Sequence, residues 1–247
     1  MVMPLSSHRI EEVDALRGAG IVAMVLFHFF FDLRFLGLSA LDPYAGPYLL
    51  LQRTAASLMI IVSGISLALS RASAERQGVS FHPKLLRHVS VLGAAALLVT
   101  FATWIYPHEG FIVFGVLHFL ALSALLAAPL TRQPFLALAF GVLVFATSSV
   151  FTGQTPAFGS PFLLWFGFPP SDFYSLDYFP LLPWFGLFLF GVFLGSYYYA
   201  RGARLLQGAK KFPRPLLWLS RRSLLAYLIH QPVLFAILLS YKFLAGL

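Results

Sequence analysis

Long apolar segments, separated by short charged ones, constrain this chain more than any other feature of its sequence. An apolar run of about 18 or more residues with few charges is typical of a helix that spans a membrane. We identify seven such segments, with ends near Pro, Gly or charged residues: 15–36, 48–70, 85–106, 111–130, 134–151, 178–199 and 223–244. The sequence therefore predicts an all-α, polytopic membrane helix bundle of about seven transmembrane helices, formed as a single domain over residues 1–247.

The composition agrees with this class of protein. Only 11% of the residues are charged and 59% are hydrophobic, whereas about 25% of the residues in a soluble domain are charged. The chain has no cysteine, which excludes disulfides, thiolate catalysis and thiolate metal sites. The stretch SSHRIEEVD precedes the first apolar run, and no small-residue cleavage site follows at the distance typical of a signal peptide. We therefore expect the first run to be retained as a span.

The basic residues indicate how the bundle is oriented. They lie between the apolar runs, so we attribute the net charge of +8 to membrane topology and not to nucleic-acid binding. With the N-terminus in the cytoplasm, the inside would hold most of the Lys and Arg residues: Arg71, Arg76, Lys84, Arg87, Arg132, Arg201, Arg204, Lys210, Lys211, Arg214, Arg221 and Arg222. The positive-inside rule then predicts a cytoplasmic N-terminus, an external C-terminus and an odd number of spans.

Two further segments are predicted to lie outside the spans. The basic segment at about 208–222 has an apolar Leu-Leu-Trp centre, which favours an interfacial helix on anionic membrane lipids. The segment at about 152–177 is rich in Pro, Gly and aromatic residues, and we expect it to form a long outer loop over the bundle. Whether this loop covers a substrate or only packs on the helices is left open.

The first span retains a histidine and a carboxylate at adjacent turns. Charged residues at the centre of a span cost about 2.5 to 3.5 kcal/mol on insertion scales, so those present usually face the bundle interior and have a function. His28 lies eleven residues after Arg17, roughly 16 Å along a helix, and Asp32 follows at position i+4. A carboxylate there can fix the imidazole tautomer and stabilise its protonated form. We therefore predict His28 and Asp32 as catalytic residues; the alternative is a structural hydrogen bond to a neighbouring helix.

Other polar residues complete the candidate site. His118 and His230 also fall inside predicted spans, and Gln231 and Pro232 follow His230, where the proline would free a backbone carbonyl one turn earlier. No histidine or carboxylate spacing typical of a metal site occurs, so no metal is predicted. At the inner end, Asp14 and Arg17 form either a local ion pair or part of an anion site. Arg34, Arg53 and Asp177 are their counterparts at the outer end, where Arg53 and Asp177 either pair or border a substrate mouth.

Glycines in two predicted spans indicate close helix packing. Gly191 and Gly195 form a GxxxG pattern, with Gly186 in the same span and Gly64 in another. Small residues at this spacing let helix backbones approach each other.

Four blocks of sequence together resemble the bacterial branch of the heparan-α-glucosaminide N-acetyltransferase catalytic-domain family, within the transmembrane acyltransferase group. They are RIEEVDALRGAGIVAMVLFHFFFDL, FGVLHFLALSALLAAPL, DYFPLLPWFGLFLFGVFLG and LLAYLIHQPVLF, and they extend from residue 9 to residue 235. The family's Asp-x-x-Arg-Gly block falls on Asp14, Arg17 and Gly18, and its His-x-x-x-Asp-Leu block on His28, Asp32 and Leu33. Its Gly-x-Leu-His block places His118, and its His-Gln-Pro block falls on His230, Gln231 and Pro232.

The resemblance implies an enzyme of the bacterial inner (cytoplasmic) membrane that takes an acetyl or other acyl group from cytosolic acyl-CoA. The acceptor would be an amine or hydroxyl, such as a sugar or envelope component, on the far side. In eukaryotic members an asparagine occupies the place of His28, and the catalytic histidine comes later, where this chain has Ser39. The role of His28 is therefore an inference from its place in the bundle.

The residue pattern and the resemblance together predict one function for the chain. Arg17, Asp14, His230 and Gln231 are predicted to bind acetyl-CoA, and His118, Arg53, Asp177 and Arg34 to bind the acceptor. His28 would either remove the acceptor proton or carry the acyl group transiently. The alternatives are a proton-coupled transporter that uses the buried His and Asp, and a non-catalytic scaffold. A homodimer is compatible with the sequence.

Overall fold

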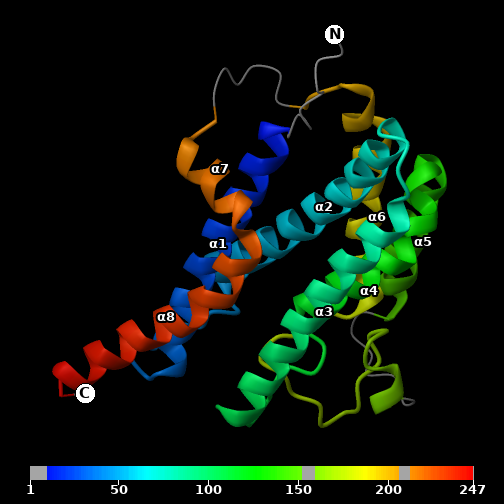
Figure 1. Cartoon of the computed structure of the whole chain (residues 1–247). Helices are drawn as coiled ribbons and strands as arrows, with labels where there is room; N and C mark the ends of the chain where they lie inside the picture. The colour runs from blue at the N-terminus through cyan, green and yellow to red at the C-terminus, as the bar shows by residue number, and fades with distance from the viewer. Residues whose placement is uncertain (1–9, 152–158, 206–211, 247) are drawn as a thin grey trace. The chain divides into compact units, whose positions relative to one another are not determined.

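The computed structural model describes residues 10–151, 159–205 and 212–246, and within these ranges it contains helices and no strands (Figure 1). The α-helices are α1 (Glu11–Phe35), α2 (Gly46–Arg76), α3 (Phe81–Ile105), α4 (Val116–Ala127), α5 (Pro134–Phe151), α6 (Leu181–Tyr197), α7 (Arg214–Arg221) and α8 (Ser223–Leu244). Short 3-10 helices cover Ala128–Arg132, Pro161–Leu163 and Tyr199–Arg201. The predicted all-α class is confirmed.

Five of the described helices are long and apolar enough to cross a membrane. They are Glu11–Phe35, Gly46–Arg76, Phe81–Ile105, Leu181–Arg201 and Ser223–Leu244. The other two predicted spans correspond to the shorter apolar helices Val116–Arg132 and Pro134–Thr147. The exact number of seven spans stays a prediction.

The helices form two compact units. One consists of Met1–Met59 with Leu205–Leu247, and the other of Ile60–Arg204. We call them the terminal unit and the middle unit and describe each by itself. Helix α2 begins in the terminal unit and ends in the middle unit.

In the terminal unit, α1 and α8 run parallel. Near the start of α1, Arg17 contacts Ser220 in the last turn of α7, just before α8 begins. Further along, Asp32 contacts Gln231, and beyond the end of α1 the backbone oxygen of Leu36 accepts a hydrogen bond from Lys242. Helix α7 packs on the first half of α1, where a Cβ atom added at Gly18 would lie 2.4 Å from the backbone oxygen of Leu216. The glycine of the Asp-x-x-Arg-Gly block therefore lets α7 lie directly against α1.

In the middle unit, the close helix packing predicted from glycines is confirmed. A Cβ atom added at Gly191 would lie 2.2 Å from the backbone oxygen of Ile61, and one at Gly64 would lie 2.2 Å from that of Phe188. Gly195 faces α2 in the same way at Ala68, and Gly186 faces α5. Glycines of α6 thus bring its backbone against both α2 and α5.

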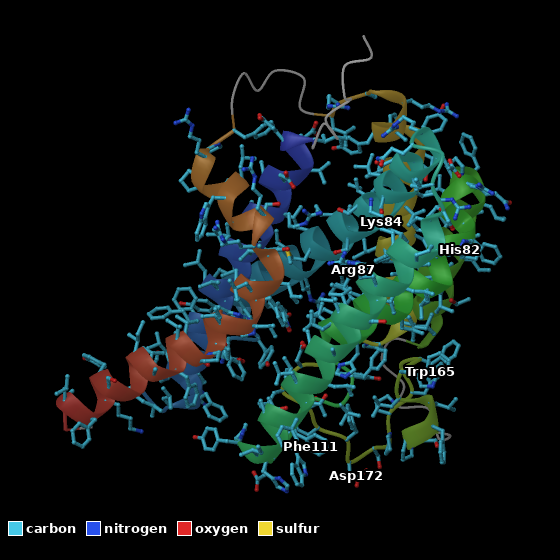
Figure 2. All side chains as sticks on the ribbon, viewed as in Figure 1. His82, Lys84, Arg87, Phe111, Trp165 and Asp172 are labelled. Carbon is cyan, nitrogen blue, oxygen red and sulfur yellow. The ribbon has the colours of Figure 1, made fainter. Side chains whose placement is uncertain are left out.

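The two segments predicted outside the spans are described in part. Of the segment 208–222, residues 212–222 are described and include the helix α7, while 208–211 lie outside the described residues. Of the loop 152–177, residues 152–158 also lie outside them, and the rest contains only the short helix Pro161–Leu163. Figure 2 places His82, Lys84 and Arg87 at the start of α3, and Asp172 of the loop near the opposite end of the middle unit.

Candidate functional site

Four of the sequence-predicted site residues meet where α1 packs on α8. The imidazole rings of His28 and His230 have centroids 4.7 Å apart and planes inclined by 73°. One helical turn further along α1, the Oδ1 atom of Asp32 accepts a hydrogen bond of 2.6 Å from the side-chain amide of Gln231. Asp32 is fully buried. The structure thus joins the predicted catalytic residues, His28 and Asp32, with two residues that we had predicted to bind acetyl-CoA.

The predicted hydrogen bond between Asp32 and His28 is not formed, although both side chains are described. The Nδ1 atom of His28 lies 2.9 Å from the backbone oxygen of Met24, and the Asp32 carboxylate bonds to α8. The cause is geometric. Spacing i+4 places the two residues on one helix face, but the imidazole turns back along its own helix while the amide of Gln231 supplies a donor from the neighbouring helix. The expected direct orientation of His28 by Asp32 is therefore corrected.

Hydrogen bonds to the backbone define the tautomer of both histidines. The Nδ1 atom of His230 contacts the backbone oxygen of Tyr227, just as that of His28 contacts Met24. A carbonyl oxygen can only accept, so in both neutral rings Nδ1 carries the hydrogen and Nε2 carries the lone pair. The lone pair is the part of an imidazole that removes a proton or attacks a carbonyl carbon. Both rings are therefore held in the tautomer that leaves Nε2 as the basic atom.

Three acceptor atoms on these residues are buried and have no hydrogen-bond partner within the described part of the chain. They are Nε2 of His230, Oδ2 of Asp32 and Oε1 of Gln231. An unsatisfied buried polar atom costs about 1–3 kcal/mol, so such atoms are few in native proteins and call for a specific explanation. Here all three atoms belong to side chains at the contact between α1 and α8, next to the imidazole of His28. The arrangement is suited to a ligand or reacting group that donates hydrogen bonds.

A second polar group joins the start of α1 to the last turn of α7. Asp14 and Arg17 form the predicted ion pair at 3.2 Å, and Ser220 donates a hydrogen bond of 2.9 Å to the Asp14 carboxylate. Arg17 also lies 3.3 Å from the Ser220 hydroxyl. Ser220 is buried, and its role could not be predicted from the sequence because its partners are about two hundred positions away. The role of Arg17 toward acetyl-CoA stays a prediction.

A cavity lies beside this group, at the start of α1. Its volume is about 510 Å³, and its lining residues are Glu11, Phe212, Arg214, Leu217, Trp218 and Arg221. Two guanidinium groups and an indole ring are well suited to a ligand that carries phosphate and an aromatic base.

Two of the predicted acceptor-binding residues are exposed arginines of the terminal unit. Arg34 lies in the last turn of α1, where a positive charge is favourable, and Arg53 lies on α2. Within the described part of the chain, neither forms an ion pair. The proposed pairing of Arg53 with Asp177, which belongs to the middle unit, stays a prediction.

His118 is placed in the first turn of a helix and not deep inside a span. The predicted span started at residue 111, whereas α4 begins at Val116. The backbone N–H of Gly115 donates to Nδ1 of His118 at 3.3 Å, which leaves Nε2–H to donate to the hydroxyl of Thr100, also at 3.3 Å. Both ring nitrogens thus have partners, an arrangement typical of a structural histidine.

Asp177 caps the same helix from a distant part of the chain. Its Oδ2 atom accepts a hydrogen bond of 2.9 Å from the backbone N–H of Val116, the first residue of α4. Burial raises the pKa of Asp177 to about 6, although the hydrogen bond from Val116 acts in the opposite direction. Burial also raises the pKa of the neighbouring Tyr178 to about 12. Asp177 is therefore a carboxyl group that holds its proton unusually well.

The described residues contain no group of three or more His, Asp or Glu side chains that could hold a metal ion. No curated protein and no solved structure matches the chain. A family model described as heparan-alpha-glucosaminide N-acetyltransferase, catalytic, matches residues 9–232, which include the contact between His28 and His230. The chain therefore belongs to the heparan-alpha-glucosaminide N-acetyltransferase catalytic family of membrane acetyltransferases.

Proposed function

We propose that this protein transfers an acetyl group from cytosolic acetyl-CoA to an amine or hydroxyl acceptor, such as a sugar or envelope component, on the far side of the membrane. The observation that carries the proposal is the pair of histidines at the α1–α8 contact, each with Nε2 as its basic atom. A basic nitrogen in a low-dielectric, water-poor site can take a proton from the acceptor as it attacks the thioester.

The chemistry assigned to His28 has two possible routes. In direct transfer, His28 takes the acceptor proton while the acceptor atom bonds to the thioester carbon and coenzyme A leaves. In the covalent route, Nε2 of His28 carries the acyl group between donor and acceptor. Asp32 supports both routes through α8, since its hydrogen bond holds Gln231.

The start of α1 is the proposed binding region for the coenzyme. Its phosphates would bind near Arg17 and the arginines of the cavity beside α7, since guanidinium groups bind phosphate oxygens in pairs. Asp14 holds Arg17, and His230 and Gln231 would contact the thioester end of the ligand. Glu11 and His28 are about 26 Å apart along α1 at 1.5 Å per residue, so an extended ligand is required.

For the acceptor we propose Arg34 and Arg53 as contacts, because both side chains are exposed. For the middle unit by itself, we propose that His118 and Asp177 contribute to acceptor binding through the start of α4, since their polar atoms already bind to the protein.

We further propose a cytoplasmic N-terminus and an external C-terminus in a bacterial inner membrane. The parallel course of α1 and α8 supports termini on opposite sides, and the arginines of α7 favour an anionic lipid surface beside the start of α1. A homodimer remains part of the proposal.

Binding of acetyl-CoA to the purified protein in detergent tests the proposal against its main alternative. A proton-coupled transporter would also use the buried Asp32 and two histidines, but it has no need to bind acetyl-CoA. We expect saturable binding by calorimetry and the appearance of labelled acetyl on an amine acceptor such as glucosamine. Arg221→Gln should weaken binding, while Arg87→Gln, an exposed arginine on α3, serves as the matched control. A folded protein that binds no acetyl-CoA would contradict the proposal.

A further inference from the structure

We propose that His230 is the proton-sharing partner of His28, and that the two imidazoles act as one catalytic pair held in place by Asp32 and Gln231. This inference rests on the proposed acyl transfer. It replaces the ligand-binding role predicted for His230 with a role in the chemical step, and it makes Asp32 a positioning residue that acts through α8.

The first observation is the unsatisfied Nε2 atom of His230. This atom is buried and receives no hydrogen bond from any described residue, while Nδ1 of the same ring is bonded to the backbone of Tyr227. A buried lone pair beside a second histidine is ready to interact with a proton that arrives on that histidine. The Nε2 atom of His28 is not among the buried unsatisfied atoms of the described residues, and we assign it as the nitrogen that meets the substrate.

The second observation is the contact between the rings. Centroids 4.7 Å apart at an inclination of 73° form an edge-to-face pair. The His230 ring has an electron-rich face and a nitrogen lone pair, and either can stabilise a positive charge on an imidazole at this distance. The stabilising group is already in place before the charge forms, which is the condition for lowering a reaction barrier.

The third observation explains how His230 is held. Gln231, the next residue, donates to Asp32 on α1, and this bond fixes the register of α8 against α1 at the position of His230. Asp32 thus performs the positioning that we had expected it to exert on His28 directly, but it does so on the neighbouring helix.

The proposed step balances without any further reactant. The acceptor N–H or O–H bond breaks and its proton passes to Nε2 of His28, while the acceptor atom bonds to the thioester carbon. The imidazolium charge is shared with His230 as the carbon–sulfur bond breaks. The proton then passes to the sulfur of the leaving coenzyme A, and both imidazoles end in the neutral form in which they began.

The test uses the full-length protein in detergent and measures release of coenzyme A from acetyl-CoA with a thiol reagent. The chain has no cysteine, so every thiol detected is released product. His230→Asn keeps an amide N–H that can donate to the carbonyl of Tyr227, and it removes the basic Nε2 together with the rest of the ring. His108→Asn is the matched control, because Nδ1 of His108 makes the same kind of bond to Trp104 on an exposed part of the chain.

We expect His230→Asn to lower kcat about 100-fold, within the range for general acid–base groups, with an unchanged Kd for acetyl-CoA. Free imidazole should restore part of the activity of His230→Ala, and His28→Asn/His230→Asn should be no slower than His28→Asn alone. His108→Asn should equal the wild type. Should His230→Asn fail to fold, His230→Gln, which also lacks a basic nitrogen, is measured in its place.

Three results would overturn the inference while leaving the proposed function intact, provided that the wild type turns over and His28→Asn does not. They are wild-type kcat in His230→Asn, a loss confined to the Kd for acetyl-CoA, and a loss that imidazole does not restore in a variant with wild-type thermal stability. A wild type that neither binds nor cleaves acetyl-CoA would instead overturn the proposed function itself.

Discussion

Asp32 has a completely buried carboxylate, and among the described residues its single hydrogen-bond donor is the amide of Gln231. Removing that donor leaves both carboxylate oxygens unsatisfied. We expect Gln231→Leu to lower the free energy of unfolding by about 1–3 kcal/mol. The same change in an Asp32→Leu background should cost much less, because both partners are then apolar. A double-mutant cycle of thermal stability in detergent measures this difference, and equal losses in both backgrounds would show that the hydrogen bond is not coupled as described.

The burial of Asp177 predicts how the stability of the protein changes with pH. Its pKa in the folded protein is raised to about 6 from the ordinary value of 3.8, so between these values the folded state binds more protons than the unfolded state. Stability therefore falls as the pH rises from about 4 to 6, and the penalty is fully present above about 6. We expect Asp177→Asn, whose amide oxygen can still accept from Val116, to raise the melting temperature at pH 7.5 and to have little effect near pH 4. A benefit that is equal at both pH values would argue against burial of the charge as the cause.

At the residue scale, the sequence indicated which polar groups matter but not how they pair. His28 and Asp32 stand out because charged and titratable groups are rare inside an apolar run. Their actual partners, Met24, Gln231 and His230, depend on the side-chain direction and on the register of α8. Neither property follows from spacing within one helix. The cap that Asp177 forms on α4 could not be predicted either, because Asp177 and Val116 are 61 residues apart in the sequence.

Among the helices, close packing of α6 on α2 depends on glycine. A Cβ atom at Gly191 would lie 2.2 Å from a backbone oxygen, which cannot move without displacing the helix. We expect Gly191→Ala to destabilise the protein by about 1–3 kcal/mol. Gly93→Ala is the matched control, since a Cβ atom at this α3 position has no atom within 4 Å, and it should be neutral or stabilising by up to about 1 kcal/mol. Equal melting temperatures for the two variants would contradict the close backbone contact.

At the element scale, the apolar runs predicted most helices well and their ends less well. Residue 223 is the start of both the predicted last span and α8, because the charged Arg221 and Arg222 mark the boundary in the sequence. The predicted start of the fourth span is five residues too early, because the segment before Val116 is as apolar as the helix that follows it. Its true start is set by His118, Asp177 and Gly115, whose contacts form only in the folded chain.

For the whole molecule, the predicted topology can be tested with single cysteines in a chain that has none. Asp172 lies in the loop predicted to be external, and Ser80 lies directly before α3 in a segment predicted to be cytoplasmic; both are exposed. We expect Asp172→Cys to react with a membrane-impermeant thiol reagent in intact cells, and Ser80→Cys only after permeabilisation. The reverse pattern would contradict the proposed orientation.

The proposal for the molecule as a whole is that His28 performs acyl transfer from acetyl-CoA. Its most direct test is thiol release from acetyl-CoA by the purified wild type and by His28→Asn, which keeps a donor for the carbonyl of Met24 but lacks the basic Nε2. We expect binding of acetyl-CoA to be unchanged in the variant and kcat to fall by at least about 100-fold. Wild-type turnover in His28→Asn, with the protein folded and acetyl-CoA bound, would contradict the account.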